Sequence, residues 1–275
     1  MNILYCGDTN IEDGLVISVL SLMRCVSEPL NIFVMTMDLT FRKWRILPVS
    51  EDTISDLDNR LKRQNEKSSI IRIDAADLFR AAPPLANMET RFTPCCMLRL
   101  YADQVPEIPE RILYLDNDVV CRKNFSGFYY QDLSEYELAG VPDYYGKWFF
   151  RKNLFHMDYM NSGVLLLNMS RIRESGLFAR CRTLCSEKKM FMPDQSAINK
   201  LAERKKLCNR VYNEQRRLHE ETVFQHFTTS FRFFPWLHTL TVKPWQIEQM
   251  HEKLKLYEYD DILQEYRTVM AELKG

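Results

Sequence analysis

Short apolar runs alternate with amphipathic stretches over most of the chain. Residues 2–7 and Asn31–Met37 have the length and alternation of strands. Between them, apolar side chains recur at helical spacing from Leu15 to Val26, which predicts a helix packed on a sheet. A strand, a helix and a second strand in this order are typical of an α/β fold with a parallel sheet.

The same alternation continues along the chain. Further strands are expected at Ser69–Ile73, Arg111–Leu115, Leu138–Pro142 and Met160–Met169, and further helices at Glu51–Asn65, Thr93–Gln104, Ile172–Lys189 and Gln195–Arg204. After residue 205 the pattern becomes irregular, aromatic and basic, and residues 245–275 are expected to form one or two helices. Since no internal repeat or low-complexity linker interrupts the chain, we expect one α/β domain with a less regular C-terminal third.

Composition narrows the class of protein. The 275 residues include 37 basic and 37 acidic side chains, and this balance argues against a nucleic-acid binder, which usually has a basic excess. The eight cysteines lack zinc-site spacing, and Cys181 and Cys185, one helical turn apart, are expected to be buried thiols in a reducing cytosol.

The N-terminus lacks the basic segment of a signal peptide, and no apolar run reaches the roughly 18 residues that span a membrane. A cytoplasmic location is therefore expected.

A basic stretch follows the last expected helix of the α/β pattern. It consists of Arg204, Lys205, Lys206, Arg210, Arg216 and Arg217. The simplest interpretation is a solvated face. The alternative is contact with anionic lipid at the inner face of the membrane or with an acidic acceptor. The sequence leaves peripheral membrane contact and oligomer formation open.

Two aspartates directly follow the apolar run Arg111–Leu115. Residues two apart on an extended backbone point to the same side, so Asp116 and Asp118 can reach one ligand. Two such carboxylates repel each other unless a cation lies between them, and hard divalent cations take carboxylate oxygens while keeping positions open for phosphate. The simpler interpretation is a pair of surface aspartates in a turn. The buried strand before them favours the cation site.

Other candidate side chains stand near the ends of expected strands. Asp8 and Asn10 follow the first strand, at the edge where open α/β sheets bind ligands, and a helix N-cap by Thr9, Asn10 or Asp13 is the alternative. His226 could complete a metal site, although a lone histidine in an aromatic stretch is more often a core residue. Lys243 precedes a proline on extended backbone and could reach a phosphate, or it is an ordinary surface lysine.

Asp194 and Gln195 open an expected helix after Pro193, and Arg99 lies on a helix upstream of the two aspartates. The guanidinium of Arg99 could counter a phosphate or a carboxylate. Neither the dinucleotide fingerprint G-x-G-x-x-G nor a P-loop occurs in the chain. The charge of a bound nucleotide diphosphate would therefore have to be met by a metal ion and by side chains.

Taken together, these residues resemble glycosyltransferase family 8, the retaining glycosyltransferases related to bacterial galactosyl- and glucosyltransferases and to glycogenin. The resemblance covers residues 2–245 and rests on the order of its marks: Asp8-x-Asn10, Arg99, Tyr114–Asp118, Asn161–Leu165, Asp194–Gln195, His226 and Lys243–Trp245. It implies an α/β GT-A fold, a single Rossmann-like nucleotide-binding domain over residues 1–245, whose mixed, mostly parallel central sheet is flanked by helices. Residues 246–275 would be a C-terminal helical extension.

The resemblance also implies an activity and a set of site residues. The enzyme would move a hexose, galactose or glucose, from a UDP-sugar to a hydroxyl of a saccharide acceptor such as bacterial surface polysaccharide or lipopolysaccharide, with Mn²⁺ (or Mg²⁺) as cofactor. By position, the metal ligands would be Asp116, Asp118 and His226. The uridine contacts would be Asp8 and Asn10, and the diphosphate contact Lys243. The residues around the donor sugar would be Arg99, Asn161, Asp194 and Gln195, with Asp194 and Gln195 as the catalytic residues. Asn117 would also contribute to donor binding.

The sequence departs from the family pattern at two places. Thr229 takes the place of a glycine, with an aromatic insert at residues 230–241 after it, and Ile11 replaces the usual aromatic residue after Asn10. The position expected to face the anomeric carbon is Gln195, whose amide is a poor nucleophile. We therefore expect front-side attack with retained configuration, and a covalent intermediate on Asp194 is the alternative.

Three other interpretations compete with this one. Aspartyl-phosphate phosphatases also carry D-x-D at a strand end, but they continue with Gly-Thr, whereas Val119 follows here. A UDP-sugar- and metal-binding module without strong turnover would fit the change at Thr229. Glycogenin-like self-glycosylation is permitted by the tyrosine-rich loops. The acceptor walls are expected at the aromatic loop 144–150 and the insert 230–241, although core packing or an oligomer contact would explain these aromatics too.

Overall fold

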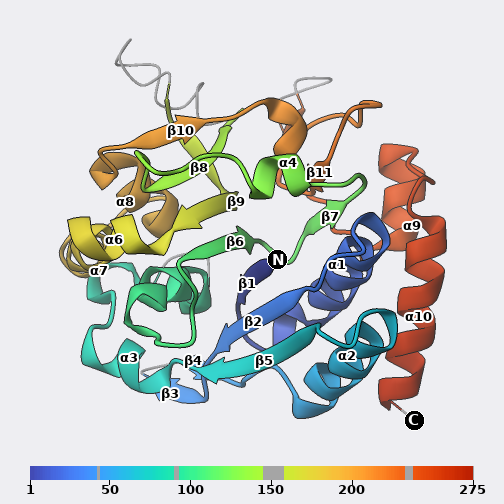
Figure 1. The fold of residues 1–275 in the computed structure, drawn as a ribbon, viewed down its shortest axis with the longest axis horizontal. Coiled ribbons are helices and arrows are strands. Elements are labelled where there is room, and N and C mark those ends of the chain that lie inside the picture. Colours follow the sequence, from blue (N-terminus) through green and yellow to red (C-terminus); the bar gives the residue numbers. More distant parts are fainter. Residues whose placement is uncertain (42–43, 90–92, 145–157, 233–237, 275) are drawn as a thin grey trace.

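The computed structural model describes residues 1–274 apart from 42–43, 90–92, 145–157 and 233–237. Its centre is a seven-stranded sheet with the order β10-β8-β9-β6-β1-β2-β5 (Figure 1). In chain order these strands are β1 (Asn2–Cys6), β2 (Asn31–Thr36), β5 (Ser69–Asp74), β6 (Arg111–Leu115), β8 (Leu138–Pro142), β9 (Met160–Asn168) and β10 (Lys205–Leu207).

Most neighbouring strands of this sheet run in parallel. β1 pairs in parallel with β2 and β6, β2 with β5, and β8 with β10. β9 is antiparallel to both of its neighbours, β6 and β8. The prediction of a mixed, mostly parallel sheet is therefore confirmed. The carboxyl ends of β1, β6 and β8 lie at one edge, the edge at which such sheets bind ligands.

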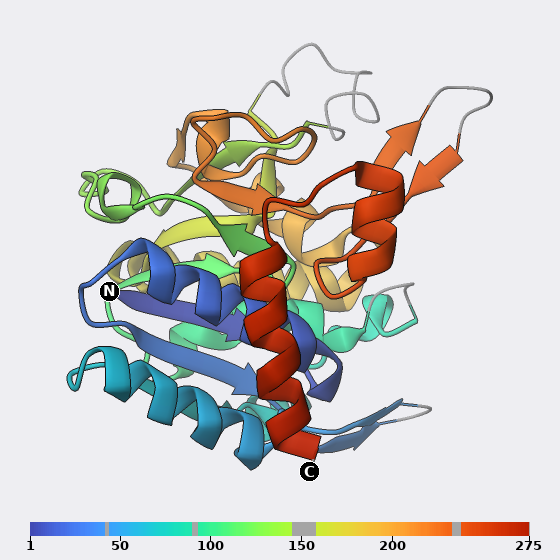
Figure 2. The same cartoon turned by 90° about the vertical axis from the view of Figure 1, so that its right-hand side faces the viewer.

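Helices cover both faces of the sheet (Figures 1 and 2). They are α1 (Glu12–Cys25), α2 (Glu51–Gln64), α3 (Ala76–Ala81), η3 (Pro94–Gln104), α6 (Met169–Ser175), α7 (Leu177–Glu187), α8 (Pro193–Leu201) and α10 (Asp260–Lys274). α1 and α2 begin with acidic residues, which the helix dipole favours. Ser50 caps α2, since its Oγ accepts the N–H of Thr53 at 3.2 Å.

Successive residues of β1 enter two different cores. Ile3 and Tyr5 pack in the core that contains α1, and the Tyr5 hydroxyl lies 2.7 Å from Ser18 Oγ on that helix. Leu4 points to the opposite face and packs in the core that contains Leu98 of η3 and Phe178 of α7. A strand buried on both faces must be apolar along its whole length, which explains the first apolar run of the sequence.

Two of the expected helices differ from the structure. The stretch Ile172–Lys189, expected as one helix, is divided between α6 and α7, because Gly176 between them adopts a left-handed conformation with φ +64°. A glycine at this conformation ends the first helix without steric cost. The stretch around Arg99 is the 3-10 helix η3 rather than an α-helix.

The remaining elements are short. They are η1 (Thr9–Ile11), β3 (Leu39–Phe41), β4 (Trp44–Ile46), η2 (Leu85–Asn87), β7 (Val119–Cys121), α4 (Ser126–Tyr129), η4 (Arg210–Tyr212), β11 (Phe224–His226), β12 (Ser230–Arg232), β13 (His238–Leu240), α9 (Ile247–Gln249) and η5 (Met250–Leu254). Within the described residues, three antiparallel pairs form outside the main sheet, β3 with β4, β7 with β11, and β12 with β13.

The C-terminal helices confirm the expected helical end of the chain. α10 runs along the outside of α1 and α2 (Figure 2). Leu263 and Val269 of α10 are buried in the same core as α1, and the Tyr266 hydroxyl donates to Asp13 at 2.7 Å. The boundary at residue 245 stays a prediction. In the described part of the chain, every helix is too short or too polar to cross a membrane.

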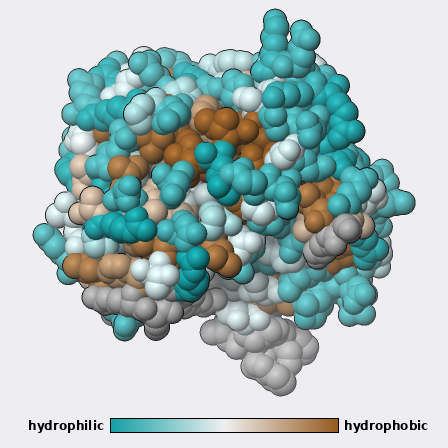
Figure 3. Space-filling view, turned by 90° about the horizontal axis from the view of Figure 1, so that it is seen from below, coloured by the Kyte–Doolittle hydropathy of each residue, from teal (hydrophilic) through white to brown (hydrophobic). Residues whose placement is uncertain are grey.

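The edge strand β5 lies on the side of the molecule seen in Figure 3, where apolar patches interrupt a mostly polar surface. A groove beside β5 is lined partly by Ile71 and Ile73. The strand is protected from pairing with other chains, because Asp58 Oδ1 accepts the N–H of Ile70 at 3.1 Å and charged Arg72 and Asp74 follow.

Candidate functional site

The two aspartates of the D-x-D stretch lie at the carboxyl end of β6. The N–H of Asp116 donates to the carbonyl of Gly163 at 2.8 Å, which extends the pairing of β6 with β9 beyond Leu115. The chain then turns into β7. Because β7 pairs with β11 so that Val119 stands opposite His226, the histidine is brought next to Asp118.

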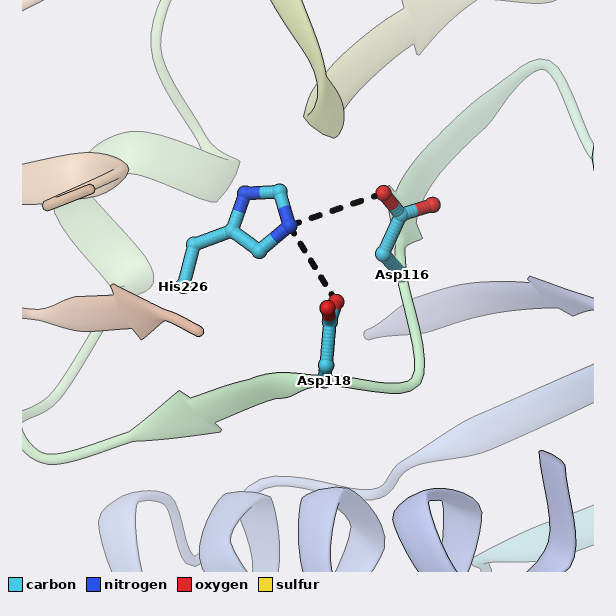
Figure 4. Close-up of side chains that lie close together, drawn as sticks. All are labelled: Asp116, Asp118 and His226. Carbon is cyan, nitrogen blue, oxygen red and sulfur yellow. Dashed lines mark ion pairs between the residues drawn. The ribbon is translucent and has the colours of Figure 1, made fainter. Parts of the chain in front are cut away.

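The side chains of Asp116, Asp118 and His226 converge (Figure 4). His226 Nε2 lies 3.6 Å from Asp116 Oδ2 and 3.1 Å from Asp118 Oδ1, and one ligand atom from each of the three lies within 4.8 Å of the others. His226 and Asp118 are buried, and Asp116 is partly exposed. Two carboxylate oxygens and an imidazole nitrogen on one open-sided cluster fit a divalent cation of the Mn²⁺ or Mg²⁺ kind.

Gly163 gives this cluster its space. A Cβ atom at residue 163 would lie 2.7 Å from His226 Nδ1 and 2.8 Å from Asp116 Oδ2, closer than side-chain atoms approach. Gly14 has a similar role below the D-x-D turn, since a Cβ there would lie 2.6 Å from Asn117 Nδ2. Asn117 therefore packs against α1.

Arg99 joins two carboxylates from different parts of the chain. Its Nη2 donates to Asp116 Oδ1 at 2.9 Å, and its Nε lies 3.2 Å from Asp194 Oδ2. The guanidinium also lies 3.8 Å from the centre of the Tyr114 ring, and the Tyr114 hydroxyl donates to Asp116 at 2.6 Å. Burial lowers the pKa of Arg99. Tyr114 and the two carboxylates raise this pKa by more than burial lowers it, so the guanidinium stays charged.

Lys243 also reaches the cluster. Its ammonium forms an ion pair with Asp118 Oδ2 and donates to the carbonyl of Phe227 at 3.1 Å. Burial raises the pKa of Asp118, but the charges and hydrogen bonds of Lys243 and His226 outweigh burial and hold it well below its usual range. Asp118 is therefore ionised at neutral pH, as a cation ligand must be.

Asp194 and Gln195 lie in the first turn of α8, both buried. Burial raises the pKa of Asp194, and the charge of Arg99 opposes that shift. Gln195 Oε1 accepts the N–H of Ser162 at 2.9 Å, and Gln195 Nε2 donates to Asp143 Oδ2 at 2.9 Å. These contacts bring the expected donor-sugar residues to the same edge of the sheet as the cluster.

Asp8 and Asn10 follow β1 at the same edge. Asp8 Oδ1 accepts both the backbone N–H and the side-chain Nδ2 of Asn10 at 3.0 Å, so it caps η1. Asp8 is buried and Asn10 is exposed. The cap is therefore Asp8, on η1, and not Thr9, Asn10 or Asp13, while α1 begins without a side-chain cap. The uridine contacts stay a prediction.

The structure adds two residues to the expected set, Asp143 and Asn213. Asp143 directly follows β8 and holds Gln195, and the rule that selected Asp8, a polar residue after an apolar strand, would have selected it too. Asn213 Oδ1 lies 3.1 Å from His226 Nδ1. It stands in the irregular part of the sequence, where no periodic pattern marks it.

Two expectations lie largely outside the described residues. They are the aromatic loop 144–150 and the insert 230–241 as acceptor walls. Around the insert, β12 and β13 pair, and Thr229 Oγ1 lies 2.8 Å from Thr241 Oγ1.

The basic stretch is described, and most of its members contact neighbouring side chains or carbonyls: Arg204, Lys205, Lys206, Arg210 and Arg216. This arrangement favours the simple surface interpretation over lipid contact.

Comparison with known proteins gives a family and a fold. The sequence model described as "Glycosyl transferase family 8" matches residues 2–248. Glycosyltransferase GlyA of Streptococcus pneumoniae is 35% identical over 106 residues, which is 38% of this chain and 14% of that protein. The protein Gly of Streptococcus gordonii is 32% identical over 118 residues, 42% of this chain and 16% of its own length. The aligned segments therefore span a small part of these relatives.

Solved structures agree over the whole chain. An active-site mutant of LgtC superposes with a TM-score of 0.67 at 15% identity, covering 99% of this chain and 96% of that one. GlyE of Streptococcus pneumoniae has a TM-score of 0.62 at 18% identity, covering 97% of this chain and 63% of that one. At these identities the likeness concerns the fold, which is the GT-A fold expected from the sequence.

Proposed function

We propose that this chain, which belongs to glycosyl transferase family 8, transfers a hexose from a UDP-sugar to a hydroxyl of a saccharide acceptor with retained configuration. Family membership itself makes it a glycosyltransferase and confirms the resemblance seen in the sequence. The observation that carries the finer proposal is the convergence of Asp116, Asp118 and His226 beside Lys243. A solved structure of similar fold is described as LgtC in complex with donor and acceptor sugar analogues, which supports this choice of substrates.

The cation site would be completed by the diphosphate of the donor. A divalent cation held by the cluster would act as a Lewis acid toward the departing UDP. Lys243, now paired with Asp118, would turn its ammonium to the diphosphate, because the cation takes over the neutralisation of that carboxylate. Asp8 and Asn10 would contact uridine, and Asn117 and Asn161 would line the donor site.

The contacts of Gln195 and Asp194 support front-side attack. Gln195 carries no charge, and both ends of its amide are held, by Ser162 and by Asp143. Asp194 is buried against Arg99, and a carboxylate paired in this way is a weakened nucleophile. We infer that both residues orient the donor sugar, and that the leaving phosphate accepts the proton of the acceptor hydroxyl.

The proposal is tested with UDP-galactose and UDP-glucose as donors. Wild-type protein should hydrolyse one of them slowly in the presence of Mn²⁺ and transfer faster when an acceptor is added. Asp116→Asn and Asp118→Asn should each abolish metal-dependent hydrolysis, because an amide is a poor ligand for a hard cation, while circular dichroism stays unchanged. A thermal shift with UDP and Mn²⁺ but no hydrolysis of any UDP-sugar would favour the binding-module alternative.

The cellular setting belongs to the same proposal. We propose a cytoplasmic enzyme that acts on a bacterial surface polysaccharide or lipopolysaccharide acceptor. The most direct support is the family and the absence of a membrane-spanning helix among the described residues. Fractionation of cells that express the full-length protein would measure the share recovered with membranes.

A further inference from the structure

Asn213 is completely buried and contacts the imidazole of His226 on the side away from the two aspartates. We propose that Asn213 is a positioning residue that holds His226 in the tautomer whose Nε2 lone pair faces Asp116 and Asp118. This inference rests on the proposed cation site. The inference concerns the position of the His226 ring proton as well as cation binding, so it can be tested by measurements other than enzymatic turnover.

The orientation of Asn161 is fixed by a backbone donor. The N–H of Gly163 lies 3.0 Å from one terminal atom of the Asn161 amide, and an N–H can only donate, so that atom is the oxygen Oδ1. The nitrogen of the same amide then points to Asp143 Oδ2 at 3.3 Å, where a carboxylate accepts.

The orientation of Asn161 determines that of Asn213. Asn161 Oδ1 lies 2.9 Å from the second amide, and because an oxygen accepts, the atom of Asn213 that meets it is the donor Nδ2. The remaining atom of Asn213, Oδ1, therefore faces His226 Nδ1 at 3.1 Å. An amide oxygen cannot donate, so Nδ1 must carry the hydrogen.

A neutral imidazole has one N–H and one lone pair. With the hydrogen on Nδ1, the lone pair of His226 is on Nε2, the atom nearest to Asp118 Oδ1 and Asp116 Oδ2. Without Asn213, the neighbouring carboxylates would favour the other tautomer, because an Nε2–H could donate to them. Asn213 thus opposes the arrangement that would block cation binding.

The first test observes the ring directly. Long-range ¹H–¹⁵N correlation spectra of the protein loaded with diamagnetic Mg²⁺ and UDP should show Nδ1 protonated, with its hydrogen protected from exchange by Asn213, and Nε2 without a hydrogen. Asn213→Leu should shift the population toward Nε2–H. A wild-type spectrum with the proton on Nε2 would overturn the proposal.

The second test measures Mn²⁺ affinity by electron paramagnetic resonance. Asn213→Leu should weaken binding about 10- to 100-fold, the usual effect of losing an outer-shell partner of a metal ligand. Asn213→Asp keeps an acceptor for the Nδ1 hydrogen and should bind Mn²⁺ more tightly than Asn213→Leu. Equal affinities of wild type and Asn213→Leu would overturn the proposal.

A matched control separates positioning from general stability. Asn87 is also fully buried, and it donates to the carbonyls of Cys185 and Lys188 and accepts the N–H of Met190. Asn87→Leu should lower stability as Asn213→Leu does, but leave Mn²⁺ affinity unchanged. If Asn87→Leu weakened Mn²⁺ binding equally, a structural role for Asn213 would suffice. If wild-type protein bound neither Mn²⁺ nor Mg²⁺, the proposed cation site would fail, whereas normal wild-type binding with equal affinity in Asn213→Leu would count against the role of Asn213 alone.

Discussion

Individual side chains determine whether the proposed site can bind a cation. The cluster brings negative charge from Asp116 and Asp118 together in a partly dehydrated place, and Arg99 and Lys243 supply two positive charges beside it. Removing one member of a buried ion pair leaves the other charge unpaired. The resulting loss of stability is larger than the net stabilisation that the intact pair provides. The absence of a side chain at Gly163 matters as much as these charges, because a Cβ atom there would collide with the imidazole of His226.

Gly163→Ala tests the need for that room. The added methyl group would collide with His226 and Asp116, so we expect Mn²⁺ affinity to fall about 10-fold or more and the free energy of unfolding to fall by about 1–3 kcal/mol. Isothermal titration calorimetry and urea unfolding measure the two effects.

Gly176→Ala serves as the control for this prediction. It replaces a glycine at positive φ with open space around it, so it should cost about 1 kcal/mol of stability without any change in Mn²⁺ affinity. Unchanged Mn²⁺ binding by Gly163→Ala would contradict the geometry of the site.

At the scale of elements, two strand pairings assemble the site. β6 and β9 place Asp116 beside Gly163, and β7 and β11 place Asp118 beside His226. The first turn of α8 then brings Asp194 and Gln195 against η3 and β9. α10 has a different role, because it buries apolar side chains in the core that contains α1.

Leu263→Ala tests the contribution of α10. Leu263 is 1% exposed and lies in the α1 core, so its truncation should lower the free energy of unfolding by about 2–5 kcal/mol. Gln264→Ala, an exposed position on the same helix, should change stability little. A separate early transition in Leu263→Ala, with the rest of the protein unaffected, would show that residues 246–275 unfold as an independent extension.

At the scale of the whole molecule, binding of the cation and the nucleotide should be coupled. Asp116, Asp118 and His226 would hold the cation, and the cation would offset the charge of the diphosphate, so each ligand would lower the electrostatic cost of binding the other. The groups of the proposed site come to the carboxyl edge of the sheet from β11 and η3 as well as from the ends of β1, β6 and β8, from α8 and from the segment after β13.

Thermal unfolding tests this coupling. UDP at 100 times its Kd should add about 2.7 kcal/mol, a rise in Tm of roughly 5–10 °C for a domain of this size. We expect this rise with Mn²⁺ present and a much smaller one without it. Asp118→Asn should remove the difference between the two conditions. A shift by UDP that is independent of Mn²⁺ would contradict the proposed cation site.

The sequence by itself determined most strands and helices of the α/β core, because apolar periodicity depends on neighbouring residues alone. It did not predict β10 of the main sheet or the short strands after it, which lie where the pattern was expected to be irregular. The sequence also selected Asp116 and Asp118, although the two residues lie in a turn, with the N–H of Val119 donating to the carbonyl of Asp116 at 3.2 Å, and not on the extended backbone that was expected. For Arg99, His226, Asp194 and Gln195 the order of family marks was needed in addition, since each residue type alone has a simpler explanation. The split of Ile172–Lys189 at Gly176 was missed, because an isolated glycine is compatible with a helix until its φ is known.

Only the tertiary structure decided which distant groups meet. The pairing of β7 with β11, the contact of Arg99 with both Asp116 and Asp194, and the amide of Asn213 behind His226 all join segments far apart in the chain. Their approach depends on packing of the two cores and on the closure of long loops, and neither leaves a periodic pattern in the sequence. The residue types of the proposed ligands can thus be recognised from the local sequence, while their convergence in one site depends on the fold.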